Sequence, residues 1–285
     1  MIHPSLRTRF VRIHKKFFKE ILSGTECYQK PGSKATSGLD LLRKPPFVIC
    51  ADGKNLQLVV NHIITDGHSM QLVVRNLLKL LSDEQIAMDD SHLFHSWIHN
   101  QFQKHGADHR QYWSSRLKNF VYNQLPTSHP RLVIRGNQAA LLNFQMSQLR
   151  KRLGSWVHTY GCTPFAAVLA LLSRTLQSIS YDPSMPVAIG FPVNLRTHKL
   201  QNSVACGIST VMIAHDTTES PEKVVGGISM EVAQAMSHAF LSYDQLMELS
   251  PSKKLFSVMV TFDDYSVEEN DIFRVDHVAA VTTKI

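Results

Sequence analysis

Residues 61–67 read Asn-His-Ile-Ile-Thr-Asp-Gly and place several chemically useful groups within one short segment. Imidazole is the side chain suited to general acid–base work near pH 7, so His62 could take a proton from an attacking amine, hydroxyl or thiol. Asp66 could orient that imidazole or pair with an arginine, and Gly67 would allow a backbone conformation closed to other residues. The same spacing also arises by chance in a chain with 15 histidines, so the flanking elements must be considered.

The elements around this segment would hold His62 where a strand gives way to a helix. Residues 56–60 are aliphatic and β-branched, which predicts a strand, and residues 70–81 carry apolar side chains at helical spacing. A second strand is expected at 47–50, joined to the first through a hairpin at Asp52-Gly53. Binding and catalytic groups concentrate on loops held by such rigid elements.

Strand and helix patterns alternate over the rest of the chain, which predicts two α/β lobes, each with a mixed sheet. The polar segment 121–137, with Pro126, Pro130 and Gly136, is expected to cross between them. The lobes are therefore expected at 1–120 and 138–285. Further helices are predicted at 91–117, 149–160, 163–178, 221–240 and 243–248, and further strands at 139–146, 185–190, 209–215, 255–262 and 275–285.

Composition narrows the functional classes. The chain has 285 residues, of which 44% are hydrophobic, but no apolar run of the roughly 20 residues that a membrane span needs. Its start does not resemble a signal peptide, so a cytoplasmic protein without a membrane partner is expected. The four cysteines are scattered, which predicts neither a zinc site nor a disulfide framework. Although His92, His95 and His99 could share a helix face, no further ligand is evident and no metal site is predicted.

The formal net charge of +7 suggests an anionic partner, which could be nucleic acid, a phosphorylated cofactor or an acidic carrier protein. The densest basic group lies within residues 7–19 and is interleaved with phenylalanines. Because no recognisable nucleic-acid module accompanies it, we predict no nucleic-acid partner.

Several motifs, in order along the chain, resemble the condensation domains of nonribosomal peptide synthetases. Residues 3–10 are similar to the family's Arg-His-x-x-Leu-Arg-Thr-x-Phe signature, with Ile2 at the first arginine. Residues 61–67 resemble its His-His-x-x-x-Asp-Gly motif, with Asn61 at the first histidine. The other similar pieces are Trp97, Tyr112-Trp113 with Leu117, Leu125-Pro126-Thr127, Thr163-Pro164-Phe165, the run 190–196 with Gly190, Pro192 and Arg196, and the late strand at 256–265.

This resemblance implies two lobes of the chloramphenicol acetyltransferase type, arranged as a V with the active site between them. It implies an acyltransferase that forms an amide (peptide) bond between a carrier-bound acyl or aminoacyl thioester and an acceptor amine. No bound cofactor is expected, because the substrates would arrive on the phosphopantetheine of a carrier protein or on CoA.

The resemblance also assigns roles to single residues. His62 is the implied catalytic histidine, Asp66 a mainly structural carboxylate, and Gly67 a backbone position lining the reacting centre. Asn61 would be tolerated because the second histidine of the motif carries the chemistry. A buried Asp66 would need a cationic partner, for which Arg7, Arg9 and Arg196 are the candidates.

The sequence departs from the family's pattern, and these differences leave two alternative functions open. The chain is expected to be a domain truncated at both ends, since it begins inside the first arginine motif and stops before the family's last elements. It also shows no adenylation or carrier motif. It could therefore be a stand-alone O- or N-acyltransferase that uses acyl-CoA or a carrier, although the plant-type Asp-Phe-Gly-Trp-Gly motif is absent. It could also be an inactive remnant or a binding module.

Overall fold

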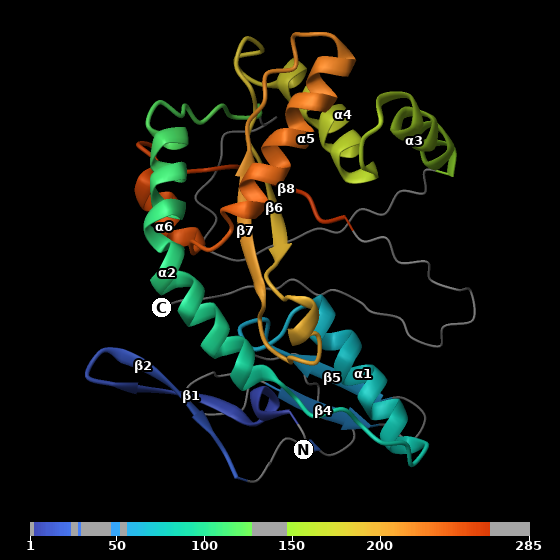
Figure 1. Cartoon of the computed structure of the whole chain (residues 1–285), viewed down its shortest axis with the longest axis vertical. Coiled ribbons are helices and arrows are strands. Elements are labelled where there is room, and N and C mark those ends of the chain that lie inside the picture. Colours follow the sequence, from blue (N-terminus) through green and yellow to red (C-terminus); the bar gives the residue numbers. More distant parts are fainter. Residues whose placement is uncertain (1–2, 24–27, 30–46, 52–55, 127–146, 263–285) are drawn as a thin grey trace. The chain divides into compact units, whose positions relative to one another are not determined.

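The computed structural model describes residues 3–23, 28–29, 47–51, 56–126 and 147–262, which form a mixed α/β fold (Figure 1). The helices are α1 (Gly67–Leu81), α2 (Ser91–Leu117), α3 (Ser147–Tyr160), α4 (Pro164–Ile179), α5 (Pro221–Ser237) and α6 (Tyr243–Leu249), with short 3-10 helices at Pro4–Arg7 and His198–Leu200. The strands are β1 (Thr8–Ile13), β2 (Lys16–Ile21), β3 (Tyr28–Gln29), β4 (Phe47–Ala51), β5 (Leu56–Val60), β6 (Ile189–Asn194), β7 (Ile208–Ile213) and β8 (Val258–Met259).

The chain divides into two compact units that do not follow each other in sequence. Unit 1 contains residues 1–110 together with 193–209, and unit 2 contains residues 111–192 together with 210–285. The segment 193–209 thus belongs to unit 1 although unit 2 surrounds it in sequence. The crossing expected at 121–137 lies largely outside the described residues, and the V-shaped arrangement of two lobes stays a prediction.

A mixed sheet and α1 form the core of unit 1. Strand β4 pairs parallel with β3 and antiparallel with β5, from Phe47 opposite Val60 to Ala51 opposite Leu56. The predicted pairing of the strands at 47–50 and 56–60 is therefore confirmed, while the turn at Asp52-Gly53 lies outside the described residues. The buried cluster on this sheet consists of Leu6, Phe47, Ile64, Leu72, Val73 and Val204.

The N-terminal residues form an antiparallel hairpin that the sequence patterns did not indicate. Its strands β1 and β2 pair from Thr8 opposite Ile21 to Ile13 opposite Lys16. The two turn residues, His14 and Lys15, have φ angles of 47° and 66°. These angles lie in the left-handed region, which glycine and asparagine usually occupy in such turns. Neither residue type signals a turn, which explains why the hairpin was missed.

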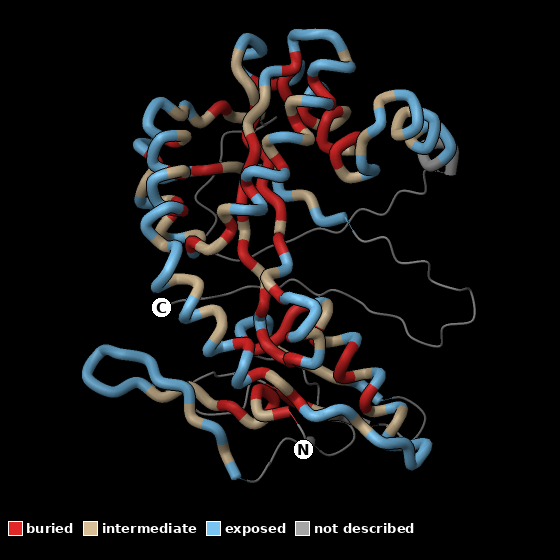
Figure 2. Tube along the Cα trace, in the orientation of Figure 1, coloured by how far each residue is buried: buried red, intermediate tan, exposed pale blue. Residues whose placement is uncertain are grey.

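A further three-stranded sheet has the order β7-β6-β8. Most residues within β6 and β7 are buried (Figure 2). Strand β6 begins at Ile189, so the strand expected at 185–190 was placed too early. Met185 instead closes a turn, in which its N–H donates to the carbonyl oxygen of Asp182 at 3.1 Å. Strand β8 has only two residues, fewer than the strand expected at 255–262. The strands expected at 139–146 and 275–285 lie outside the described residues.

Helix α4 shows how local sequence sets an element of unit 2. Thr163 caps it, with Oγ1 accepting the N–H of Ala166 at 3.1 Å, and Pro164 occupies the first helical position. No single described helix is long and apolar enough to cross a membrane, although α3 from Lys151 and α4, bent by 102° at their junction, pass that test as a pair on length and composition alone.

Candidate functional site

The turn that carries His62 lies in unit 1, between β5 and α1, and the side chain of Asn61 closes it. Oδ1 of Asn61 accepts the N–H of Ile63 at 3.0 Å, while its backbone oxygen accepts the N–H of Ile64 at 3.2 Å. Asparagine is favoured in such turns because its side chain can bond the backbone two residues on. Ile64 is only 3% exposed and anchors the turn in the core, whereas His62 is exposed.

Asp66 begins α1 as its N-cap. Its backbone is extended, and Oδ1 accepts the N–H of Ser69 at 2.9 Å. This contact satisfies one of the free amide groups at the helix start, and the helix dipole favours a negative charge there. The helix consequently starts at Gly67, three residues before the predicted 70–81. The expectation that Gly67 adopts a conformation closed to other residues was wrong, because Gly67 is the first residue of an ordinary helical turn and has no positive φ.

The guanidinium of Arg196 is the cationic partner of Asp66, with Nη1 donating to Oδ2 at 2.7 Å. Both side chains are almost completely buried, at 0% and 1% exposed. Arg196 has five N–H donors, and the structure gives it five acceptors. These are Asp66 Oδ2, Asn194 Oδ1, Ser69 Oγ, and the carbonyl oxygens of Ser203 and Ala205. The buried charge therefore has the complete set of hydrogen bonds that makes such a pair tolerable.

Gly207 completes the environment of the carboxylate, and sequence analysis did not identify it. Its N–H donates to Asp66 Oδ2 at 2.7 Å. A Cβ at this position would lie 2.5 Å from Nη1 of Arg196, so only glycine permits this approach. No local sequence signal marks the position, because the restriction comes from Arg196, which is eleven residues earlier.

The pKa of Asp66 reflects two opposing effects. Burial alone would raise the pKa of this carboxyl. The hydrogen bond and charge of Arg196, together with the N–H groups of Ser69 and Gly207, outweigh burial and hold the pKa below its ordinary value. Asp66 is thus ionised at neutral pH, with its two oxygens engaged within the protein.

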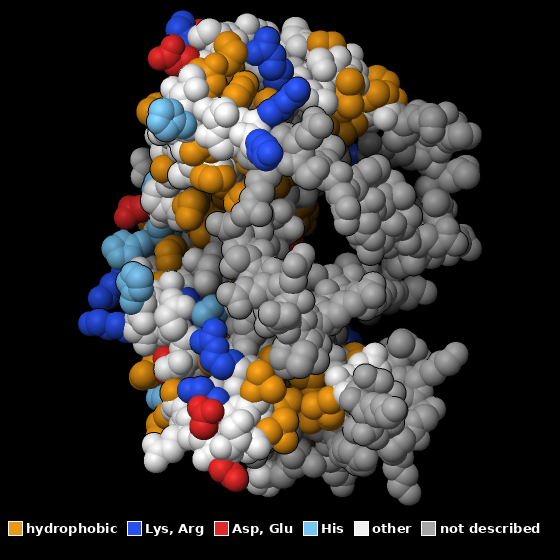
Figure 3. All heavy atoms as spheres, turned by 90° about the vertical axis from the view of Figure 1, so that its right-hand side faces the viewer, with side chains coloured by type: hydrophobic (Ala, Val, Ile, Leu, Met, Phe, Trp, Pro, Cys, Tyr) orange, Lys and Arg blue, Asp and Glu red, His pale blue; other side chains and the backbone are white. Residues whose placement is uncertain are grey.

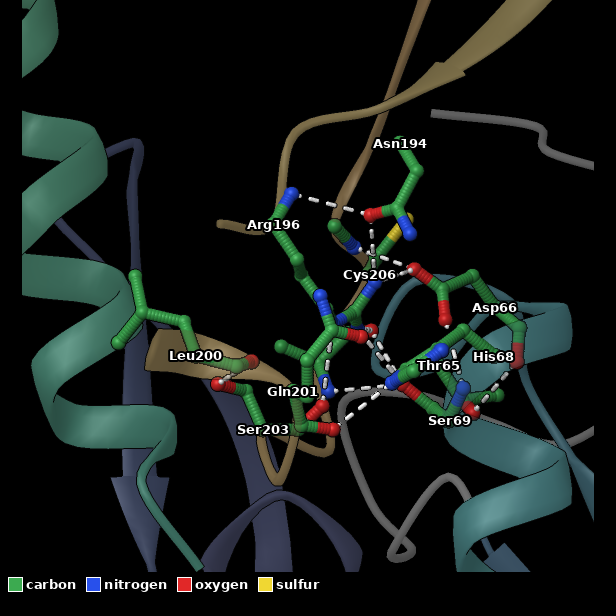
Figure 4. Close-up of polar contacts among 12 residues, drawn as sticks. Thr65, Asp66, His68, Ser69, Asn194, Arg196, Leu200, Gln201, Ser203 and Cys206 are labelled. Carbon is green, nitrogen blue, oxygen red and sulfur yellow. Dashed lines mark hydrogen bonds and ion pairs between the residues drawn. The ribbon is translucent and has the colours of Figure 1, made fainter. Parts of the chain in front are cut away.

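Ser69 joins the segment 193–209 to the start of α1 (Figure 4). Its hydroxyl donates to the carbonyl oxygen of Ala205 at 2.7 Å and accepts the N–H of the same residue at 3.0 Å. Nearby, the imidazole Nε2 of His68 lies 2.8 Å from the carbonyl oxygen of Gln201. Ser69 was also missed, since a serine in the first turn of a helix is common and only the folded chain reveals its partners.

In the described part of unit 1, the imidazole of His62 has one hydrogen-bond partner, the thiol of Cys206. The Sγ atom lies 3.8 Å from Nδ1 of His62, and both residues are exposed. Neighbouring atoms displace part of the water around Sγ and raise the pKa of the Cys206 thiol, and the negative charge of Asp66 raises it further. The site therefore presents an imidazole and a neutral thiol to solvent, behind which Asp66 and Arg196 are buried.

The other two candidate arginines do not contact Asp66. Nη1 of Arg7 donates to the carbonyl oxygen of Leu22 at 2.7 Å, and Nε of Arg9 donates to Glu20 Oε2 at 2.7 Å. Both contacts lie within the N-terminal hairpin region. Of the three arginines proposed from the sequence, Arg196 is the partner.

Of the three α2 histidines considered as ligands, His95 lies beside a lysine. Nε2 of His95 lies 3.2 Å from Nζ of Lys19, and burial followed by the charge of that lysine lowers the pKa of His95. Across the described ranges, no three His, Cys, Asp or Glu side chains are grouped closely enough to hold a metal ion.

Comparison with known proteins identifies the family. The model of the condensation domain matches residues 28–281, so the chain belongs to the condensation domain family. Among curated proteins, chondramide synthase cmdD from Chondromyces crocatus is 24% identical over 165 residues, which covers 56% of this chain and 4% of that protein.

Solved structures of nonribosomal peptide synthetase domains share the fold. Holo-AB3403, a four-domain synthetase bound to AMP and glycine, superposes with a TM-score of 0.74 at 17% identity, over 87% of this chain and 21% of that one. The X-domain from teicoplanin biosynthesis gives 0.71 at 18%, over 88% and 64%. The EpoB cyclization-docking bidomain from Sorangium cellulosum gives 0.69 at 17%, over 90% and 60%. The chain spans less than two thirds of the length of each of these relatives.

Proposed function

We propose that this chain transfers an acyl or aminoacyl group from a thioester to an acceptor amine, with His62 handling the proton of the amine. The observation that supports this division of roles is the burial of Asp66 behind His62. The carboxylate oxygens bind Ser69, Arg196 and Gly207, so they are not available to a substrate. His62 is exposed on the turn that this carboxylate helps to fix.

The chemistry requires two kinds of help. The attacking amine must lose a proton, which a neutral imidazole can accept, and such help is typically worth about 10²–10⁴ in rate. The tetrahedral intermediate carries an oxyanion that needs hydrogen-bond donors. The amide groups at the start of α1, near Gly67, and Nε2 of a protonated His62 are the donors we propose.

We further propose that the donor thioester is presented on phosphopantetheine, either of a carrier protein or of CoA. The family supports this choice, because condensation domains act on carrier-bound thioesters. The positive net charge would favour both sources, since each carries phosphate. On the face drawn in Figure 3, the described Lys and Arg side chains are scattered among other side chains, so charge does not mark one docking patch on that face.

The test is acyl transfer by the purified chain, with hexanoyl donors on a carrier protein, on CoA and on N-acetylcysteamine, and with a primary amine as acceptor. His62→Ala should lower amide formation by about 10²–10⁴-fold. His99→Ala is the matched control, because it removes another exposed histidine, on α2. Equal turnover by the wild type and His62→Ala would contradict the assignment.

The choice of donor and acceptor separates the alternatives. Turnover with hexanoyl-CoA but not with the carrier-bound donor would favour a stand-alone acyltransferase. An ester product from an alcohol acceptor would show that the chain also catalyses O-acylation. No product from any donor, with a folded sample, would favour a binding module.

A further inference from the structure

Hydrogen bonds to the residue on each side hold the backbone at Cys206, whose thiol lies beside His62. Before it, Ala205 exchanges two hydrogen bonds with the hydroxyl of Ser69. After it, Gly207 donates to Asp66, and its carbonyl oxygen accepts the N–H of Leu195 at 2.8 Å. Four hydrogen bonds to the backbone of Ala205 and Gly207 therefore hold the backbone of Cys206 near His62.

Position and exposure give this thiol access to whatever reaches His62. The 3.8 Å between Sγ and Nδ1 is within hydrogen-bond distance for sulfur, and both residues face solvent. A thiol beside an imidazole is the arrangement in which the base can take the thiol proton as sulfur attacks a carbonyl carbon. Thioesters undergo this attack readily, because one thioester is replaced by another.

We propose that Cys206 accepts the acyl group from a thioester bound at His62. This inference rests on the proposed function, because it needs a thioester at the same site. Sγ forms a bond to the carbonyl carbon while the bond from that carbon to the donor sulfur breaks. The thiol proton moves to Nδ1 of His62, which returns a proton to the departing sulfur. An acceptor amine then discharges the acyl-cysteine, forming the C–N bond, breaking the C–Sγ bond and returning a proton to Sγ through His62.

The electrostatics of the site agree with a base-assisted step. The pKa of the Cys206 thiol is raised by loss of water around sulfur and by Asp66, so the group is a neutral thiol at pH 7. A neutral thiol is a poor nucleophile until a base removes its proton. Acylation of Cys206 should therefore depend on His62, unlike the reaction of an already ionised cysteine.

The test is to incubate the full chain with hexanoyl-N-acetylcysteamine, without acceptor, and to follow its intact mass. Wild type should gain a single hexanoyl group, mapped to Cys206 by peptide analysis and released by neutral hydroxylamine, as a thioester is. Cys206→Ala should gain none, and His62→Ala should react about 10²-fold more slowly or worse. The matched control is Cys162→Ala, which removes another free thiol and should be labelled as the wild type is.

In the labelling experiment, three results would overturn the inference: a folded wild type that gains no acyl group, a label on another residue that persists in Cys206→Ala, or equal labelling of wild type and His62→Ala. A chase with a primary amine separates this inference from the proposed function. Amide product at the wild-type rate from Cys206→Ala overturns the inference and leaves the proposed function standing. A His62-dependent label on Cys206 that no amine discharges supports acylation of the thiol and contradicts amide formation.

Discussion

At the scale of single residues, the buried pair of Asp66 and Arg196 carries the main structural lesson. Neither side chain reaches solvent, and their hydrogen bonds connect α1 to a segment that follows 130 residues later. Burying two charges is costly, and the cost is met only where every donor and acceptor has a partner. The five acceptors around Arg196 fulfil that condition, so this pair is a structural device that supports the turn of His62.

The first prediction at this scale is that Asp66→Asn lowers the free energy of unfolding by about 3–5 kcal/mol, the usual cost of leaving one partner of a buried ion pair uncompensated. Equilibrium unfolding in urea at pH 7 measures it. Glu20→Gln is the control, because it removes an acid from a pair with Arg9 whose side chains are more than 40% exposed. Such pairs contribute about 0–1 kcal/mol. Equal losses in the two variants would contradict the prediction.

The same pair gives a pH dependence. The pKa of Asp66 is lower in the folded chain than in the unfolded chain. The ionised carboxylate therefore contributes fully to the free energy of unfolding above the unfolded-state pKa of about 3.9, and this contribution is lost as the pH falls through the folded-state pKa. The gap in stability between wild type and Asp66→Asn should therefore be constant near neutrality and shrink in acid. A gap that grows as the pH falls would contradict the sign.

Sequence reasoning identified both members of the pair but left the partner of Asp66 open among Arg7, Arg9 and Arg196. The reason is physical, because the motif fixes only the chemistry that Asp66 needs. Its partner is decided by which distant segment packs against α1. Ser69 and Gly207 were missed for the same reason, as their roles exist only once residues 193–209 are in place.

At the scale of elements, the helices were predicted better than the strands. Helix α2 has the predicted bounds 91–117, and α4 begins one residue after its predicted capping threonine, because caps and 3.6-residue periodicity are local signals. Strands depend on partners. Strand β8 is limited to the two residues that pair with Ile189 and Gly190 of β6, which its own sequence does not reveal. The hairpin of β1 and β2 was missed because its turn uses His14 and Lys15.

A prediction at this scale concerns the start of α4. Thr163→Ala removes the oxygen that accepts the N–H of Ala166, and should lower the free energy of unfolding by about 0.5–2 kcal/mol. Ser220→Ala is the control. Ser220 is also an N-cap before a proline, at the start of α5, but its side chain makes no capping hydrogen bond. Chemical denaturation of both variants measures the difference, and an equal effect would show that the cap of α4 contributes nothing.

At the scale of the whole molecule, the two units are interleaved along the chain. Unit 1 obtains from residues 193–209 both the partner of its buried carboxylate and a core residue, Val204, that is 0% exposed. A piece of chain that ends before this segment therefore lacks part of the interior of unit 1. Periodicity in the sequence does not show that a later segment returns to an earlier unit. The sequence alone therefore suggested two lobes of continuous chain, at 1–120 and 138–285.

The corresponding prediction is that residues 1–120, expressed alone, do not form a cooperatively folded unit, because Asp66 is left without Arg196 and Gly207. Residues 1–110 joined to 193–209 by a flexible linker should restore dispersed amide resonances in an NMR spectrum. The matched control is the same fusion with Arg196→Ala, which should lose them. Well-dispersed resonances from residues 1–120 alone would show that the later segment is dispensable.

The separation between Asp66 and Arg196 in the sequence also delays the formation of their ion pair during translation. A ribosome adds about 5–20 residues per second, so the 130 residues between the two side chains take roughly 7 to 26 s to appear. Throughout that interval, the nascent chain contains the turn of His62 without the arginine that neutralises its neighbour. Unit 1 can complete its interior only after residues 111–192 of unit 2 have all been translated, and the early part of the chain is accessible to chaperones for that time.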